Sequence, residues 1–583
     1  MKEIVINNWQ EGIGQSPHVG FGDMRNIDIK NRPGVARINV ALDRMTPSAV
    51  AVTFTADAGT DKITISSGNL YNDPNLTSAE GRAVTFSTTT TLPAPLATST
   101  TYWLINGGTS TTYKVATSLA NAIAGTAIDI TDAGTGTHTV TSVNMGIPQF
   151  FAKEPSSGNL YMQDSNARVW NYGVSGSGWV LISGNTTTNG NAQGLVIWEN
   201  YLFAFRSARV DVYGSLTVAL GSRAWTNDWQ TLTASAGESN DHFAYVSSIN
   251  NRLYFADRDT TTGKPYVGSV KLATGTFDPA TASTYTYTAQ DLDLPAYKVI
   301  TCMEDLGNTI LVGTIDREIY VWDGTEESWS NIIFAPEPYI GSMRTFNNVT
   351  YFSAGERGNI YATVGSSAVL FKEFPESILN YPTGISYNIK SLITHQGKLL
   401  FTLAGTSSAI SGVYSIDMNT RALVLENVIG LGTYVSSAIP CLYSDEDSYY
   451  CGWYSGSVGG IDRTYVSGGD YYRQTSYGAY IETPMYEVGT ETQKRDFGIL
   501  EFNLAKPLTT GQGIRISYRT STSASYTIIG TFDFTTYGGI QSFHKRSPNI
   551  PSCIMVQLKI ELTTGTDSTT TPELKSVILK SLK

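Results

Sequence analysis

Charged side chains are scarce in this sequence of 583 residues. Asp, Glu, Lys and Arg together make up 15% of the chain, against about 25% in typical soluble proteins. Hydrophobic residues reach 41% and aromatic residues 11%, a composition too apolar for a disordered chain. The formal net charge is −11, and basic residues form no cluster. A nucleic-acid-binding surface is therefore not expected, because phosphate binding needs a basic face.

Cysteines and long apolar runs are also few. Four cysteines, Cys302, Cys441, Cys451 and Cys553, are too few for a disulfide scaffold. Cys441 and Cys451 could pair across a hairpin, but buried free thiols are the commoner state and the one we expect. No run approaches the ~18 apolar residues of a membrane span, and the first nine residues lack the apolar core of a secretory signal. We therefore expect assembly in a cytoplasm and no stable membrane insertion.

Catalytic motifs are missing as well. The five histidines include no pair at a metal-ligand spacing, and His395 lies in a predicted turn, where a solvated side chain is favoured over a base. The segment Thr262-Gly263-Lys264-Pro265 lacks the first glycine and the hydroxyl of a phosphate loop. The acidic turn Asp445-Glu446-Asp447 has the oxygen ligands that Ca²⁺ prefers, but a solvated hairpin tip is favoured. The sequence thus predicts no catalytic residue, no cofactor, no metal ligand and no enzyme.

What the sequence does contain is a repeat in its middle part. Seven segments share a polar turn with Asn, Gly or Asp, followed by mostly large apolar residues that start a strand. The spacing between segments is 40 to 57 residues, and one four-stranded propeller blade occupies about 40–50. The third residues of the segments are Leu160, Leu202, Leu253, Ile310, Thr350, Leu399 and Tyr449.

The repeat predicts an all-β fold built on a β-propeller. Strands before and after each turn make the unit a β-meander, and one meander cannot bury both of its faces unless it stacks on others. We expect seven blades, with six as the second choice, over residues 146–478. An array of sandwiches is the alternative, since any Tyr-rich β chain yields some hairpins by chance.

Three flanking regions complete the predicted organisation. Residues 46–145 read as an inserted β-rich module, with one or two helical turns over 118–124 and a closing hairpin between 127–130 and 137–140. Residues 1–45 are expected to contribute strands to the propeller, with the alternating strand 37–42 completing the last blade. Residues 479–583 alternate apolar and polar residues in several strands, which indicates a C-terminal β-sandwich.

Part of the inserted module resembles a known type of domain. The stretch from Tyr102-Trp103-Leu104-Ile105-Asn106 through Gly134-Thr135-Gly136-Thr137-His138-Thr139-Val140 looks like a non-enzymatic β-domain that recurs in tail and virion proteins of bacteriophages. The larger layout is similar to the tail nozzle proteins of short-tailed phages, in the opening segments 7–9 and 31–34 and in the C-terminal segments 481–484 and 494–497. That resemblance implies a homo-oligomeric ring (a hexamer) in the virion tail. It also implies contacts with adaptor and fibre proteins, and an acidic lumen past which DNA slides during ejection.

Two function classes follow. The first is a structural virion protein, a nozzle-like tail ring that conducts DNA without sequence-specific binding and docks other tail proteins. The second is a receptor-binding, carbohydrate-binding or depolymerase propeller at the tail tip. A cellular propeller that serves as an interaction scaffold is a third, weaker reading, because the virion-type module does not fit it.

Overall fold

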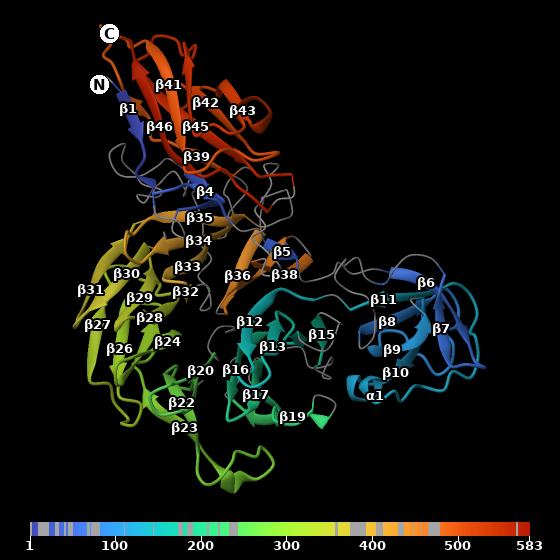
Figure 1. The fold of residues 1–583 in the computed structure, drawn as a ribbon. Helices are drawn as coiled ribbons and strands as arrows, with labels where there is room; N and C mark the ends of the chain where they lie inside the picture. The colour runs from blue at the N-terminus through green and yellow to red at the C-terminus, as the bar shows by residue number, and fades with distance from the viewer. Residues whose placement is uncertain are drawn as a thin grey trace.

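The fold is all-β, as the sequence predicts (Figure 1). The computed structural model describes residues 3–9, 23–29, 34–39, 42–44, 51–66, 70, 82–109, 111–143, 145–172, 179–182, 191–206, 209–219, 222–232, 243–259, 261–355, 359–373, 392–403, 412–428, 437–445, 447–455, 458–464, 479–566 and 569–582. Helical structure in these residues is limited to short elements such as α1 (Leu119–Ile123) and α3 (Phe534–Tyr537).

Seven four-stranded antiparallel meanders are present within the described residues. Their first strands are β12 (Pro148–Lys153), β16 (Ala192–Trp198), β20 (Ala244–Val246), β24 (Ile300–Leu306), β28 (Met343–Phe346), β32 (Leu392–His395) and β36 (Ser437–Ser444). Their second strands are β13 (Leu160–Asp164), β17 (Tyr201–Arg206), β21 (Leu253–Arg258), β25 (Thr309–Thr314), β29 (Val349–Ala354), β33 (Lys398–Leu403) and β37 (Tyr449–Ser455).

The third and fourth strands complete each sheet. The third strands are β14 (Val169–Tyr172), β18 (Arg209–Gly214), β22 (Pro265–Leu272), β26 (Glu318–Trp322), β30 (Asn359–Val364), β34 (Gly412–Asp417) and β38 (Val458–Thr464). The fourth strands are β15 (Trp179–Leu181), β19 (Ala224–Thr231), β23 (Tyr285–Asp293), β27 (Asn331–Phe334), β31 (Ser367–Lys372), β35 (Leu423–Val428) and, in the last meander, β5 (Leu42–Arg44).

Each of the seven sequence repeats coincides with the turn between the first and second strands of one meander. The residue that opens or nearly opens the second strand is buried in every case, with 0 to 4% of its surface exposed, as at Leu202 and Ile310. Several of these turns have two successive residues with positive φ, the geometry of two-residue hairpins. Such pairs are Glu199-Asn200, Asn347-Asn348 and Gln396-Gly397. The Asn and Gly of the repeat are there because the backbone turns through the left-handed region.

First strands of most neighbouring meanders lie side by side. These contacts join β12 to β16, β16 to β20, β24 to β28, β28 to β32 and β32 to β36. The first strand of the seventh meander, β36, packs beside β12 of the first meander. This contact brings the two ends of the series together. In Figure 1 the first strands lie toward the middle of this part of the molecule, and β19, β23, β27 and β31 lie toward its margin.

The inserted module is a separate six-stranded sheet that closes on itself in the order β10-β7-β6-β11-β8-β9. Its strands are β6 (Ala51–Asp57), β7 (Lys62–Ile65), β8 (Ala83–Thr88), β9 (Tyr102–Thr109), β10 (Thr112–Ala116) and β11 (His138–Ser142). The predicted helical turns exist as α1. The predicted hairpin between 127–130 and 137–140 is wrong: β11 pairs with β6 on one edge and β8 on the other, which leaves no edge for residues 127–130.

The C-terminal unit consists of one four-stranded sheet and the end of a larger, ten-stranded sheet, and the two share one apolar core. One sheet has the order β1-β46-β41-β44 and the other β39-β45-β42-β43. Their bounds are β1 (Glu3–Ile6), β39 (Ala479–Glu482), β41 (Phe497–Leu504), β42 (Gly513–Arg519), β43 (Thr527–Asp533), β44 (Ser542–Arg546), β45 (Met555–Thr563) and β46 (Leu574–Ser581).

The N-terminal segment contributes strands both to the meanders and to the C-terminal unit. β1 pairs with β46 in the C-terminal unit, and Arg37–Ile38 form β4, which pairs with β3 (Ile27–Asp28). Among the described N-terminal strands, β5 is the one that completes a four-stranded meander, along β38. The alternating pattern in residues 37–42 identified strand character but could not identify the partners. The partner of β4 is the nearby strand β3, whereas the partner of β5 is β38, far along the chain.

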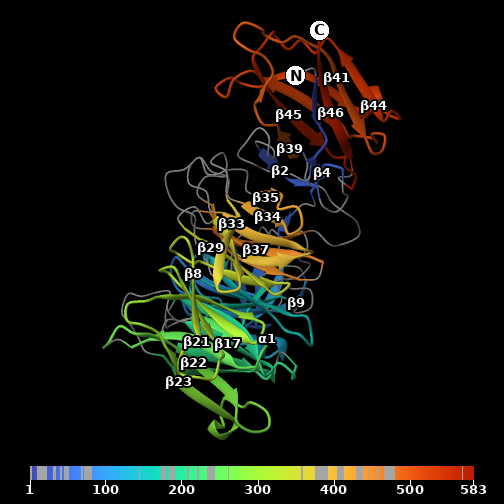
Figure 2. The same ribbon diagram turned by 90° about the vertical axis from the view of Figure 1, so that its left-hand side faces the viewer.

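A short strand connects the meanders to the C-terminal unit. β2 (Asp23–Arg25) pairs in parallel with β35 of the sixth meander and antiparallel with β39 of the C-terminal unit. Figures 1 and 2 both place β4 between β35 and β39, and Figure 2 shows β2 there as well. One continuous sheet therefore runs from the sixth meander into the C-terminal unit.

Candidate functional site

The turns between first and second strands carry polar side chains that join neighbouring meanders. Lys153, at the end of β12, forms an ion pair of 2.6 Å with Asp445, which follows β36. The Asn251 amide donates to Glu199 at 2.5 Å between the third and second meanders. The Ser247 hydroxyl donates to Asp305 at 2.9 Å between the third and fourth. Polar residues in and beside these turns therefore connect neighbouring meanders.

His395 lies in this set of turns, but the prediction of a solvated side chain is wrong. It is 9% exposed, and its Nδ1 lies 2.9 Å from the Ser444 hydroxyl of the next meander. Burial, together with the nearby Lys398 ammonium, lowers the pKa of His395 despite the opposing effect of Glu426. The neutral imidazole is therefore a buried contact between the sixth and seventh meanders.

The acidic turn that could have bound Ca²⁺ holds a different partner. Asp445 is engaged by Lys153, while Glu446 lies outside the described residues. No group of three or more His, Cys, Asp or Glu side chains is placed to hold a metal ion anywhere in the described ranges. Cys302, Cys441, Cys451 and Cys553 are free and buried, so the expectation of buried free thiols is confirmed.

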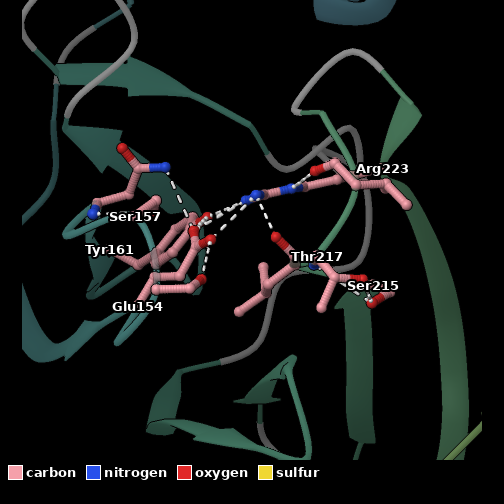
Figure 3. A network of polar contacts seen from close by, with 10 residues as sticks. Glu154, Ser157, Tyr161, Ser215, Thr217 and Arg223 are labelled. Atoms are coloured by element: carbon pink, nitrogen blue, oxygen red, sulfur yellow. Dashed lines mark hydrogen bonds and ion pairs between the residues drawn. The ribbon is translucent and has the colours of Figure 1, made fainter.

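A buried ionic network joins the first two meanders (Figure 3). Glu154 follows β12 and Arg223 precedes β19, and their exposed side-chain fractions are 1% and 5%. The two guanidinium nitrogens of Arg223 donate to the two carboxylate oxygens of Glu154 at 3.0 and 3.1 Å. The Tyr161 hydroxyl from β13 donates to Glu154 at 3.0 Å. Such two-pronged pairing fixes the relative position of the two meanders.

The electrostatics of this network favour the ion pair. Burial by itself raises the pKa of Glu154, but hydrogen bonds from Arg223, Ser157 and Tyr161 outweigh it and leave that pKa below the ordinary value. Burial by itself lowers the pKa of Arg223, and its contact with Glu154 reverses that effect. Burial raises the pKa of Tyr161 well above its usual range. The glutamate is thus ionised and the tyrosine neutral, so the network is a structural link and not an acid–base pair.

A second buried network lies where the sixth meander meets the N-terminal segment. Lys398 opens β33, and its Nζ lies 2.6 Å from Oε1 of Glu426 in β35. The Ser415 hydroxyl from β34 donates to the same oxygen at 2.6 Å. The side-chain amide of Asn39 donates to Oε2 of Glu426 and, at 3.1 Å, to its backbone carbonyl. The residues Asn39, Lys398 and Glu426 have 7, 9 and 3% of their surface exposed.

A local irregularity directs Glu426 into this network. Val413 pairs with Asn427 and Tyr414 pairs with Leu425, so Glu426 is the extra residue of a β-bulge between them. A bulge turns a side chain away from the regular alternation of the strand. Glu426 is thereby brought to Asn39, which is separated from it by 387 positions in the chain.

Sequence reasoning found none of these networked charges. Glu154, Arg223 and Glu426 lie among polar turn and strand residues with no motif around them. Lys398 lies in one of the repeat segments, whose pattern does not single it out. The available signal was weak: a charged residue in a mostly apolar strand, such as Glu426 within Leu423–Val428. Within the described residues, no helix has both the length and the apolar character needed to cross a membrane.

Comparison with known proteins assigns neither a family nor a function to the chain. A scan against models of known protein families finds no match, and a search of curated proteins finds no significantly similar sequence. The chain's function is therefore argued from its own residues.

Proposed function

We propose that the seven meanders form a seven-bladed β-propeller, and that the chain is a structural, non-enzymatic protein of a bacteriophage tail. In this proposal several copies, six by analogy with nozzle proteins, assemble into a ring that conducts DNA and docks adaptor and fibre proteins. The inserted barrel and a C-terminal β-sandwich supply additional contact surfaces.

One observation carries the structural role: buried charged side chains join the parts of the chain to one another. Glu154 and Arg223 link two meanders, and Lys398 and Glu426 meet Asn39 of the N-terminal segment. The N-terminal segment also pairs with the last meander and with both sheets of the C-terminal unit. This arrangement suits a protein that must keep its shape while neighbours attach to it.

Apolar side chains on outer strands support an assembly role. Phe334 on β27 is 62% exposed, and Leu370 and Val369 on β31 are 50 and 45% exposed. β27 and β31 are paired in one sheet, and contiguous exposed apolar patches are typical of surfaces that contact other proteins. The barrel packs on the first meander through Trp103, whose indole donates to the Leu181 carbonyl at 3.1 Å, so a partner bound to the barrel would also be connected to the meanders.

Electron microscopy of the purified full-length chain tests the proposal. We expect closed rings of identical subunits, and antibodies to the chain should label the tails of particles. A monomer that releases reducing sugar from bacterial envelope polysaccharide, or that is retained on it, would contradict the proposal and favour the carbohydrate-binding or depolymerase alternative.

A further inference from the structure

We propose that Lys398 and Asn39 form a covalent isopeptide bond, and that Glu426 transfers the protons in this self-catalysed reaction. The cluster has the three groups that the reaction needs: a primary amine, a carboxamide and a carboxyl group that contacts both. This inference concerns the protein's own covalent structure and does not depend on the proposed function.

The geometry places both reacting groups on one carboxylate. Nζ of Lys398 lies 2.6 Å from Oε1 of Glu426, and the carboxamide nitrogen of Asn39 contacts Oε2 of the same group. Proton transfer requires hydrogen-bond reach between donor and acceptor, and both contacts meet that condition. The Ser415 hydroxyl, at 2.6 Å from Oε1, holds the carboxylate in this orientation.

The surroundings exclude water. Each of the three residues is less than a tenth exposed, and the apolar core beside them includes Leu399, Ile416 and Leu425. Because burial disfavours charge, the free energy needed to convert the ammonium and carboxylate into a neutral amine and acid is smaller in such a site than in water. Nearby carboxylates still raise the pKa of Lys398 above its usual value, although burial by itself lowers it. The reaction therefore starts from the ion pair.

The reaction balances without any co-reactant. A proton moves from the Lys398 ammonium to Glu426, and the neutral amine attacks Cγ of Asn39. The new C–N bond forms while the original C–N bond of the carboxamide breaks, and the protonated Glu426 returns its proton to the departing nitrogen. Ammonia leaves and takes up the second proton lost by the Lys398 nitrogen, which makes ammonium. Glu426 ends as a carboxylate. No atom changes oxidation state.

The product would join the N-terminal segment covalently to the sixth meander. Asn39 follows β4, whose Ile38 amide donates to Thr571 of the C-terminal unit at 3.0 Å. The bond would close a loop from residue 39 to residue 398 at the junction of the sixth meander and the C-terminal unit. A cross-link over so long a loop limits the freedom of the unfolded chain strongly.

Mass spectrometry of the purified full-length chain tests the inference. We expect an intact mass lower than that of the sequence by one ammonia. After trypsin digestion we expect a branched peptide that joins the Asn39 and Lys398 peptides, with no cleavage after Lys398. Recovery of both peptides unlinked, from a folded chain of full mass, would overturn the inference.

Variants separate this bond from other losses of ammonia. Lys398→Arg and Glu426→Gln should each restore the full mass, whereas Lys580→Arg should not. Lys580 also pairs with a glutamate, Glu501, at 2.8 Å, but it serves here as a control. Succinimide formation at Asn106-Gly107 also loses ammonia; it would persist in Lys398→Arg and would give no branched peptide. If Glu426→Gln does not fold, the branched peptide of the unsubstituted chain still decides the question.

Discussion

Substitution of Arg223 by methionine tests whether the buried network holds the first two meanders together. Methionine keeps an apolar stem of similar length but removes the five donors. The change leaves Glu154 buried, with 1% of its side chain exposed, and removes the donors to the Leu216 and Val218 carbonyls at 2.5 and 2.9 Å. The carboxylate would then lack the positive charge that offsets its desolvation.

The magnitude follows from the remaining partners. Removal of one member of a buried ion pair typically costs about 3–5 kcal/mol. Tyr161, Ser156 and Asn159 still donate to Glu154 in the variant, so we expect the lower end, about 3 kcal/mol. Since about 1.4 kcal/mol corresponds to a tenfold change in an equilibrium constant, local opening should become about a hundredfold more frequent.

Amide hydrogen exchange read by mass spectrometry is the suitable assay, because a chain of several units does not unfold as one two-state system. Peptides from β13 and β19 should exchange faster in Arg223→Met, while peptides from β41 and β45 should not change. Arg209→Ala is the matched control: its ion pair with Asp228 is 3.8 Å long and about half exposed, so a cost below about 0.5 kcal/mol is expected. Equal effects of the two variants would refute the reasoning.

Three further predictions follow from the same structure. The pKa of Glu154 is lowered in the folded state. The stability that ionised Glu154 gives the folded chain is therefore complete above the ordinary glutamate pKa of about 4.3 and is lost as the pH falls through the lower folded value. Hydrogen exchange of β13 peptides at decreasing pH, with Glu154→Gln as reference, should show this loss. Gly459→Ala would place its Cβ 2.5 Å from the Gly146 carbonyl oxygen, so it should loosen the contact of β38 with the segment before β12 at a cost of about 1–3 kcal/mol, measured as faster exchange in β38. Gly513→Ala, where the nearest atom is 3.7 Å away, is its control. Burial raises the pKa of Cys302 to about 12, so alkylation at pH 8 should be negligible until the chain is unfolded; rapid labelling of the folded protein would contradict the buried position.

The sequence by itself determined the β class and the positions of the seven turns. Both properties are local: alternation of apolar and polar residues makes strands, and Asn or Gly permits the left-handed backbone of a tight turn, as at Asn200 and Asn348. Leu202 and Ile310 were assigned to buried strand starts for the same reason, and both are fully buried.

The tertiary structure alone decided which distant segments meet. Nothing near Arg37 distinguishes a strand that pairs with β3 from one that completes a meander, because the choice depends on which edges other strands leave open. The same holds for Glu426, which reaches Asn39 only because a bulge redirects its side chain and the chain folds back over hundreds of residues. Periodicity specifies the element, whereas the partner depends on the burial and electrostatic energy of the whole assembled chain.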